Sequence, residues 1–484
     1  MLPFGKWRPD IYDLNTQFAG EASGVLPGAT SKRPWPQLSI YTNALAAVCR
    51  GATIAISSTG AYSLFAGTAT RLYKFNSSTL NWDNVTRTVG GDYALGTDDR
   101  WQFAQFGFYL YATNIADTLQ RFDIDSGTNF AAVSGSPPQA RYIRTIGDQI
   151  FLGSLASLPN RVHWSGRNNP VFWTAGGGQD CDYQDFPDGG FVRGMTGIRG
   201  GYIFQDTAVR QFQPSQGREI YQFQQIEGAQ GLVAPDSLVT HMGMSYYVGL
   251  DGFVAIGPQG SQSIGQDAVD DWFLSNVDID RVALTIGARD PGRPRIFWLF
   301  PTSTSGYVLD HVICYDITLD EWTHAPLQAS VIFQAATAGT GLDSLDTNYP
   351  DVDAMTVSLD SRIFAGGAPL IAAFDGNHKM SFFTGSNMAA TVETAEFQAI
   401  PFRRGYVRGI APLTDASAVT IQVSKRENLN ATATWGSASS LNNQGVAPAR
   451  SSGRYHRVRA SIAAGAPWND LRGVEIDAVD AGAR

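Results

Sequence analysis

Hydrophobic and polar residues alternate along most of the chain in short runs that end in polar turns, which is the pattern of β-strands. One unit repeats: an apolar run ends in an aromatic residue and an Asn or Asp, and a polar turn leads to a second aromatic residue. It occurs in "LYKFNSSTLNWDNV" (72–85) and recurs in "LQRFDIDSGTNFAAV", "VICYDITLDEWTHA" and "IAAFDGNHKMSFF". The pattern therefore predicts a repeated β-unit rather than a single hairpin.

The spacing of this repeat predicts the architecture. Phe75 and Phe122 are 47 residues apart, and Phe122 and Trp164 are 42 apart. Repeats of about 40 to 50 residues with about four strands each are typical of propeller blades. We therefore predict an all-β fold, a β-propeller of six to seven blades, with the aromatic residues packed between the blades.

The two ends of the chain lack the repeat. The segment "GVLPGATSKRPWPQL" contains Pro27, Pro34 and Pro36, which favours an extended arm lying on its own domain or on a neighbouring subunit. From residue 391 a new alternation predicts five or six strands of a small β-sandwich or barrel. The predicted domains are an extended N-terminal arm at 1–44, the propeller at 45–388 and a C-terminal β domain at 389–484.

Two internal segments also depart from the strand pattern. "SIGQDAVDDWFLSNVD" (263–278) begins with Ser263, followed three residues later by Gln266, the capping-box pattern of a helix start. We predict a short helix there. The polar segment 335–355 predicts a long loop, which in a compact fold is usually functional or part of an interface.

Composition agrees with strands and turns rather than helices. Only eight of the 44 acidic residues are Glu and only five of the 35 basic residues are Lys, while Gly numbers 51. Glu and Lys favour helices, whereas Asp and Gly suit turns. The three cysteines are far apart and form no CxxC pattern, so neither a disulfide framework nor a zinc site is indicated. We see no signal peptide and expect no membrane segment.

The usual catalytic motifs are not found in the sequence. The six histidines do not occur at metal-ligand spacing, and neither a GxSxG nor a P-loop motif occurs. "DSGTNF" (125–130) resembles part of the Asp box of sialidase-type propellers, with Asp123 where Ser or Thr is expected, and that box is a structural hairpin. Glycoside hydrolysis needs two carboxylates across one bond, and no pair is singled out. We expect no enzymatic activity and no cofactor or metal.

Charge is unevenly distributed in a chain of net charge −9. Residues 391–484 contain 11 basic and 8 acidic residues, a net charge of +3, which leaves −12 for residues 1–390. An acidic body argues against tight binding of nucleic acid. The acidic clusters have two interpretations, solvated loops or negative charge that lines a channel after oligomerisation. The candidate channel-lining residues are Asp98, Asp99, Asp182, Asp185 and Asp188.

A basic strand near the C-terminus, "SSGRYHRVRA" (451–460), also has two interpretations. It is either a solvated strand face or a surface that docks onto an acidic partner. The candidate docking residues are Arg403, Arg404, Arg454, Arg457 and Arg459.

Several segments together resemble one family, and their order covers nearly the whole chain. They include "PDI", "GVLPGATSKRPWP", "CRGA", "LFAGTATRLYKF", "VHWSGRNNPVFW", "PDGGFVRGM", "SIGQDAVDDWF" and "SGRYHRVRASI". They resemble the tail nozzle or hub proteins, also called packaged-DNA stabilisation proteins, of short-tailed (podovirus-type) bacteriophages. None of these segments is a catalytic signature.

The resemblance implies a structural protein of the virion tail, assembled in the host cytoplasm. It implies a homo-hexameric ring of propellers below the portal and its adaptor, the head-to-tail connector. Such a ring extends the DNA channel, helps retain packaged DNA and guides its ejection without binding it specifically. It also implies contacts with tail fibre, spike or plug proteins. The alternatives are a glycan-binding or glycan-degrading propeller that recognises a host receptor, and a cellular propeller scaffold.

Overall fold

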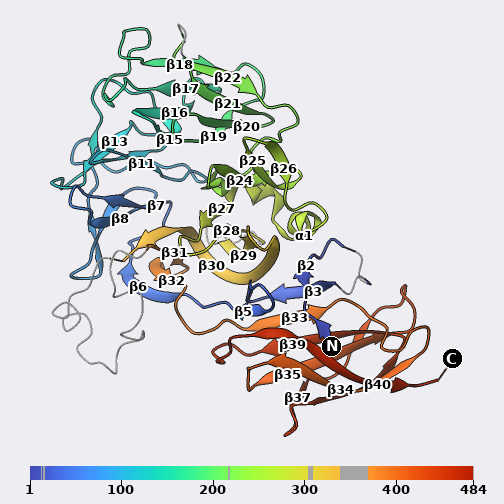
Figure 1. Ribbon diagram of the computed structural model, residues 1–484. Coiled ribbons are helices and arrows are strands. Elements are labelled where there is room, and N and C mark those ends of the chain that lie inside the picture. The colour runs from blue at the N-terminus through green and yellow to red at the C-terminus, as the bar shows by residue number, and fades with distance from the viewer. Residues whose placement is uncertain (12–13, 15–16, 216–218, 303–308, 338–368, 483–484) are drawn as a thin grey trace.

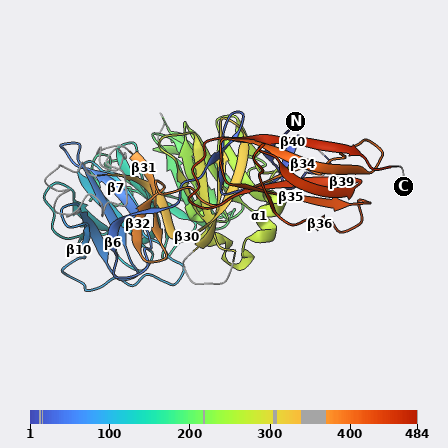
Figure 2. The same cartoon turned by 90° about the horizontal axis from the view of Figure 1, so that it is seen from below.

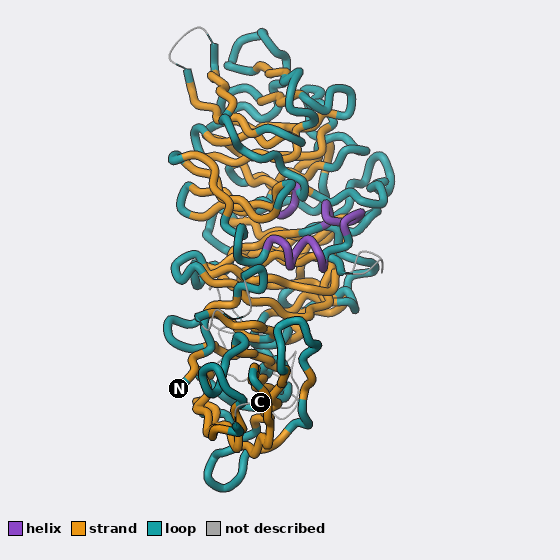
Figure 3. Tube along the Cα trace, turned by 90° about the vertical axis from the view of Figure 1, so that its right-hand side faces the viewer, coloured by secondary structure: helices purple, strands orange, loops and turns teal. Residues whose placement is uncertain are grey.

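The computed structural model confirms an all-β propeller with an N-terminal arm and a C-terminal β-sandwich (Figure 1). Both chain ends lie at the sandwich, and the view from below shows an elongated molecule with the propeller at one end (Figure 2). Strands dominate throughout, with little helix (Figure 3). The structure describes residues 1–11, 14, 17–215, 219–302, 309–337 and 369–482.

Blades 1 to 5 are five consecutive sheets of four antiparallel strands each. Their strands, blade by blade, are β7 (Ala52–Ile56), β8 (Tyr62–Gly67), β9 (Leu72–Asn76) and β10 (Asn81–Asn84); β11 (Gln102–Phe106), β12 (Tyr109–Thr113), β13 (Gln120–Asp123) and β14 (Ala131–Ala132); β15 (Ala140–Ile146), β16 (Gln149–Leu155), β17 (Arg161–Trp164) and β18 (Asp182–Asp185); β19 (Val192–Gly197), β20 (Gly201–Gln205), β21 (Val209–Pro214) and β22 (Tyr221–Gln225); β23 (Val239–His241), β24 (Met244–Gly249), β25 (Gly252–Gly257) and β26 (Gly260–Ser263).

Blades 6 and 7 share one long strand, β30 (Glu321–Ala336). Its first half completes blade 6 after β27 (Ile286–Arg289), β28 (Arg295–Phe300) and β29 (Leu309–Asp316), and its second half begins blade 7. Ala329 is the transition point, because it pairs with Leu309 on one side and Asp375 on the other. The predicted loop at 335–355 lies outside the described residues from residue 338 onwards.

An N-terminal strand closes the ring. Blade 7 continues with β31 (Pro369–Asp375) and β32 (Lys379–Phe382), and β6 (Ser39–Ala44) pairs antiparallel with β32 as its outermost strand. The pairing gives blade 7 its fourth strand, so that the N-terminal and C-terminal parts of the propeller complete the last blade together. Residues 39–44, which the sequence places in the arm, are therefore part of the propeller.

The repeated aromatic and Asp/Asn unit forms a turn that is anchored in the core. The Asp123 carboxylate accepts the backbone N–H groups of residues 125 and 126 at 3.1 Å, and Asp316 and Asp375 accept turn N–H groups in the same way. The preceding Phe122 is buried. Asp125, the Asp of the box-like segment, instead bonds the amide of Ser58 in blade 1. The unit thus combines a local Asx turn with a packing anchor.

The predicted helix is shorter than the sequence indicates. α1 spans Asp270–Asn276 and therefore begins seven residues later than predicted, while two 3₁₀ turns cover Pro235–Ser237 and Ile279–Leu284. Ser263 ends β26, and its hydroxyl accepts the Gln266 N–H at 3.1 Å, so the capping pattern forms a turn that precedes the helix. The predicted start of the helix was wrong because the hydrogen bond between a Ser hydroxyl and the N–H three residues later occurs in isolated turns as well as at helix starts.

The C-terminal sandwich consists of two sheets, both completed by strands of the arm. One contains β33 (Ala390–Thr394), β39 (Tyr455–Ile462), β35 (Val419–Arg426), β36 (Thr434–Trp435) and β37 (Ser439–Ser440), with β2 (Lys6–Trp7) and β3 (Phe18–Ser23) from the arm. The other contains β38 (Ala447–Gly453), β34 (Gly405–Thr414) and β40 (Leu471–Asp480), with β1 (Leu2–Pro3), β4 (Val25–Pro27) and β5 (Lys32–Pro34) from the arm.

The arm joins the propeller to the sandwich through continuous hydrogen bonding. Strand β2 pairs with β30 of blade 6, β3 pairs with β2, and β3 pairs with β33 of the sandwich. One sheet of 14 strands therefore runs from blades 6 and 7 through the arm into the sandwich. The arm lies on its own chain, which answers the question that its proline-rich sequence leaves open.

Buried polar side chains accompany this backbone pairing. Lys32 of β5 forms an ion pair with Glu321 of β30, and only 2% and 8% of their side chains are exposed. Burial lowers the pKa of Lys32, and the Glu321 carboxylate opposes that effect. Arg295 pairs with Asp316 at 2.9 Å and also donates to the backbone oxygen of Pro27. These contacts fix the register of the arm.

We expect Lys32→Met to lower the free energy of unfolding by roughly 3–5 kcal/mol, because it leaves the Glu321 carboxylate buried without a cation. Adding Glu321→Leu should recover most of that loss, because neither of the two positions then carries a buried charge. Urea unfolding followed by tryptophan fluorescence measures both changes.

Lys6→Met is the matched control on the same arm. Lys6 pairs with Asp320 at 3.5 Å, and both side chains are well exposed, so its loss should be below about 1 kcal/mol. Equal losses for Lys6→Met and Lys32→Met would contradict the importance of the buried pair.

Candidate functional site

The candidate acidic residues lie at two separate places on the propeller. Asp98 and Asp99 lie in the loop between β10 and β11, while Asp182 and Asp185 lie on β18, the outermost strand of blade 3. Asp188 lies in the loop between β18 and β19. Asp182, Asp185 and Asp188 line one shared pocket, and Asp98 and Asp99 are not part of its lining. The lining of a channel between subunits by these residues stays a prediction.

Three of these carboxylates are paired with arginine side chains. Arg161 forms a bidentate pair with Asp185, with hydrogen bonds of 2.6 and 2.7 Å, which holds the pKa of Asp185 below its usual range. Such pairs offset the local negative charge, so the acidic surface is weaker than the number of aspartates suggests. The other two pairs are Asp99–Arg141 and Asp188–Arg210.

The candidate docking arginines are largely paired as well. Arg459 in β39 donates to Glu393 of β33, and its guanidinium lies 4.0 Å from the centroid of the Trp435 ring. Docking onto an acidic partner therefore stays a prediction, and it would have to compete with these internal contacts. The other candidates are Arg403, paired with Asp480, Arg404, paired with Glu427, Arg454 between β38 and β39, and Arg457 in β39.

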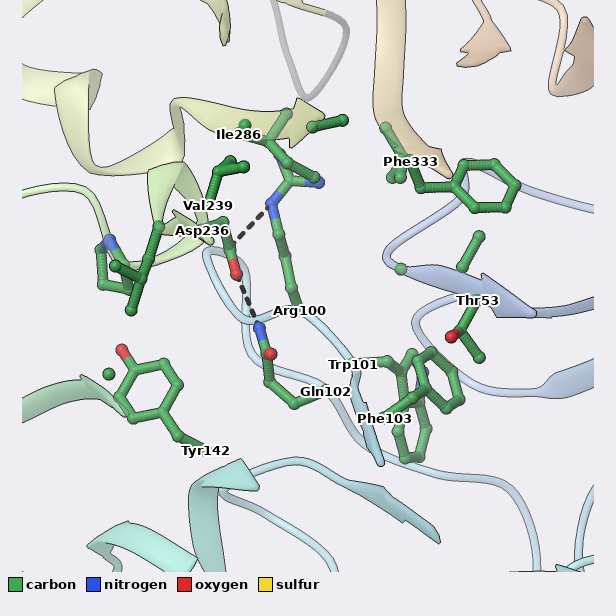
Figure 4. A pocket seen from close by; sticks show the side chains of 18 of the residues that line it. Thr53, Arg100, Trp101, Gln102, Phe103, Tyr142, Asp236, Val239, Ile286 and Phe333 are labelled. Atoms are coloured by element: carbon green, nitrogen blue, oxygen red, sulfur yellow. Dashed lines mark hydrogen bonds and ion pairs between the residues drawn. The ribbon is translucent and has the colours of Figure 1, made fainter. Parts of the chain in front are cut away.

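A central cavity of about 380 Å³ lies among the innermost strands of the seven blades (Figure 4). Its described lining carries four arginines and one carboxylate, so the cavity is basic in a chain that is acidic overall. These residues are Arg100, Arg144, Arg193, Arg289 and Asp236.

Arg100 and Asp236 form a structural contact in the cavity wall. Arg100 Nε lies 3.3 Å from Asp236 Oδ2, and Gln102 donates to Asp236 Oδ1 at 2.6 Å (Figure 4). Burial raises the pKa of Asp236, and the Arg100 cation opposes that effect. Arg100 also donates to the backbone oxygens of Leu284 and Ser330. The pair therefore joins blades 2, 5, 6 and 7 across the cavity.

Arg193 and Arg289 also have partners. Arg193 donates to the Asp206 carboxylate, and Arg289 Nη1 lies 2.9 Å from His241 Nδ1. Burial lowers the pKa of His241, and the nearby Arg289 cation lowers it further. Both guanidinium groups are thus held by the protein itself.

Arg144 differs from the other arginines of the cavity. It makes one hydrogen bond, from Nε to the Met195 carbonyl oxygen at 3.2 Å, and forms no ion pair within the described residues. Its side chain is exposed inside the cavity. The surrounding protein removes water from around the Arg144 guanidinium and so lowers its pKa, and the nearby Asp236 carboxylate opposes that effect. Since guanidinium remains charged at neutral pH, Arg144 can offer its terminal nitrogens to an anionic group.

A second polar cluster lies where the arm meets blade 6. His324 Nδ1 lies 2.9 Å from His311 Nε2, and His324 Nε2 is hydrogen-bonded to Glu21 of β3. The rings of Trp7 and Trp272 lie against His324, with centroid distances of 4.6 and 4.7 Å. Burial, and after it the neighbouring His324 side chain, lowers the pKa of His311 to about 4. Aromatic rings enclose this cluster, so it serves the attachment of the arm.

Asp270, the first residue of α1, is a buried carboxyl group beside this junction. Its Oδ1 accepts the Phe253 N–H at 2.9 Å, and a Cβ atom at Gly265 would lie only 1.9 Å from that oxygen. Burial raises the pKa of Asp270 to about 7, and the nearby Asp10 carboxylate raises it further. Asp10 belongs to the arm and accepts the first amides of α1.

Asp270 should make folding pH-dependent. Because its folded pKa of about 7 lies above the unfolded value of about 4, its stabilising effect is complete below pH 4 and is lost as pH rises through about 7. Asp270→Asn removes this titration. The variant should therefore gain on the wild type between about pH 5 and pH 8, by on the order of 2 kcal/mol, in urea unfolding.

Asp271→Asn is the control, since Asp271 is exposed on the same helix. It should keep most of the wild-type pH dependence, because Asp271 contributes less than burial and Asp10 to the raised pKa of Asp270. If Asp270→Asn and the wild type changed in parallel across this range, the titration of Asp270 would not control the stability.

Other reactive groups give no open site in the described part of the chain. Cys49, Cys181 and Cys314 are buried thiols, and burial raises the pKa of Cys49 to about 12. No cluster of three or more His, Cys, Asp or Glu among the described residues could hold a metal ion. Of the helices that the structure describes, none is long and apolar enough to cross a membrane.

Sequence reasoning missed the basic cavity. The sequence does contain a signal for it. Arg144, Arg193 and Arg289 lie in the first strands of three blades, and each is followed three or four residues later by a glycine near the end of that strand. In a propeller the first strands surround the axis, so arginines at this place in the repeat gather there. Recognising this needs the blade boundaries, which the aromatic repeat alone does not define.

Comparison with known proteins assigns this chain neither a family nor a function. No family model and no curated protein matches the chain. The WD40 repeats of RRP9 match with 10% identity and a TM-score of 0.38, covering 62% of this chain and 88% of that one. YCF48 bound to a D1 peptide matches with 11% identity and a TM-score of 0.37, covering 62% of this chain and 91% of that one. BamB from Moraxella catarrhalis matches with 13% identity and a TM-score of 0.32, covering 62% of this chain and 92% of that one.

Proposed function

We propose that this chain is a structural component of a bacteriophage tail, the subunit of a hexameric nozzle or hub ring. The ring lies below the portal and its adaptor, extends the DNA channel, helps retain packaged DNA and guides its ejection. Fibre, spike or plug proteins attach to it, and DNA passes without specific binding. The proposal rests on the resemblance of segments along nearly the whole chain to such proteins.

The observation that carries the proposal is that distant segments of this resemblance meet at one junction. Asp10 of "PDI" accepts the N–H groups of Asp271 and Trp272 of "SIGQDAVDDWF", each at 2.9 Å. Lys32 of "GVLPGATSKRPWP" pairs with Glu321 of blade 6. Two segments of the resemblance that lie far apart in the sequence, "PDI" and "SIGQDAVDDWF", therefore contact each other at the junction, while others lie in blades 1, 3 and 4.

This junction suits a protein that forms a ring exposed to mechanical force. A continuous sheet and core make the propeller and the sandwich one body, so forces pass between them without a flexible linker. Six copies with head-to-tail contacts would close into a ring. The charge of −12 on residues 1–390 would repel DNA from the wall.

The central cavity of the propeller is distinct from the proposed DNA path. A volume of about 380 Å³ is that of a small-ligand site, so duplex DNA would pass along the axis between subunits. The described lining of the cavity has a single carboxylate, Asp236, held by Arg100 and Gln102. Glycoside hydrolysis needs two carboxylates, and this favours the structural proposal over hydrolysis at this place.

Electron imaging of particles that contain this chain, averaged around the tail axis, tests the proposal. We expect six propeller-sized lobes around an axial channel below the portal, and their loss from particles made without the gene. Copies at the tail periphery, bound to host polysaccharide, would instead support the glycan-recognition alternative. Complete particles without the chain would overturn the proposal.

A further inference from the structure

A second cavity lies at the end of the central cavity where the innermost strands of blades 2 to 5 end. It has a volume of about 560 Å³ and shares Phe103, Arg144 and Thr240 with the central cavity. Arg144 is the single charged residue of its described lining. Volumes of this size are typical of ligand sites. We call this space the mouth chamber.

Apolar side chains are exposed around the mouth chamber. Ile198 lines it and is 83% exposed, and Met242, beside the lining residue Gly243, is 89% exposed. Both lie at the tips of hairpins that join the first two strands of a blade, as does the exposed Phe108. Single exposed apolar residues are ordinary, but three at the hairpin tips of one propeller face indicate a binding surface.

The conformation of Met242 is unfavourable for folding alone. Met242 and Gly243 connect β23 and β24 with φ values of +48° and +82°. Two-residue turns with both φ values positive favour Asn or Asp before Gly, because a side chain such as Met is strained there. An exposed and strained Met gains nothing from the fold, which indicates that it serves a contact with another molecule.

We propose that the mouth chamber binds a peptide segment of a partner protein in which an Asp or Glu lies between apolar residues. The carboxylate pairs with the terminal nitrogens of Arg144, and the apolar side chains contact Ile198 and Met242. Charge complementarity supports this occupant, because Arg144 is the single charged residue of the described lining and forms no ion pair within the described residues.

This inference does not depend on the tail proposal, because it concerns one face of a single propeller. The carboxylate of a side chain, rather than of a chain end, is the group proposed. Guanidinium and carboxylate form two parallel charge-assisted hydrogen bonds, which are stronger in a partly enclosed chamber than in open water.

The test uses an array of random peptides that are acetylated and amidated, so that side chains supply the only carboxylates. We expect the full chain to select peptides with one Asp or Glu between apolar residues. Fluorescence anisotropy then gives the dissociation constant of a selected peptide. Arg144→Gln should raise the dissociation constant about tenfold or more. Arg144→Lys should raise it less, because the positive charge remains while the two parallel hydrogen bonds of the guanidinium are lost.

Met242→Asn separates binding from folding. Asn suits the turn, so the melting temperature should stay unchanged or rise, while the affinity for the peptide should fall. Arg199→Gln is the matched control: Arg199 is exposed beside Ile198 but does not line the chamber, so the affinity should change by about twofold or less.

A double-mutant cycle decides whether Arg144 meets the carboxylate. Replacing the acidic residue of the peptide by its amide should weaken binding to the wild type but add little to Arg144→Gln. The proposal would be overturned if the chain selected no peptides, or selected peptides without an acidic residue. It would also be overturned if Arg144→Gln and Arg199→Gln lost equal affinity, or if inorganic phosphate displaced the bound peptide and an unlabelled copy of the peptide did not.

Discussion

The insertion of the N-terminal arm between blade 6 and the sandwich is the constraint on which the rest of the structure depends. Without β2 and β3, the outermost strand of blade 6 and the edge of β33 would both present unpaired backbone groups, which are costly when buried and prone to aggregation when exposed. The same arm continues into β6, which closes blade 7. One segment therefore completes the propeller ring and joins it to the second domain.

Buried charges make this attachment specific. Lys32, Glu321, Arg295 and Asp316 are all nearly inaccessible to solvent, and buried ion pairs contribute little net stability while strongly penalising any arrangement that separates them. Apolar contacts of Trp7 and Trp35 supply the adhesion, since burial of large aromatic side chains dominates such interfaces. The ion pairs select one register among those that apolar packing would allow.

The distribution of charge in space differs from its distribution along the chain. Aspartates dominate the body in sequence, yet many lie beside arginines, as Asp185 lies beside Arg161. The centre of the propeller collects arginines from several blades, and Arg144 remains exposed there without an ion pair among the described residues. An acidic chain thus presents a local basic site, which the net charge of −9 does not indicate.

The sequence by itself determined what depends on neighbouring residues. The turns after Phe122 and Tyr315 follow from an Asp whose carboxylate bonds amides two or three residues later, so the repeat and the propeller could be predicted. The tertiary structure decided what depends on residues hundreds of positions apart. The pairing of β6 with β32, the sharing of β30 by two blades, the capping of α1 by Asp10 and the exposure of Arg144 arise only when distant segments meet. Their energies come from contacts that no local pattern encodes.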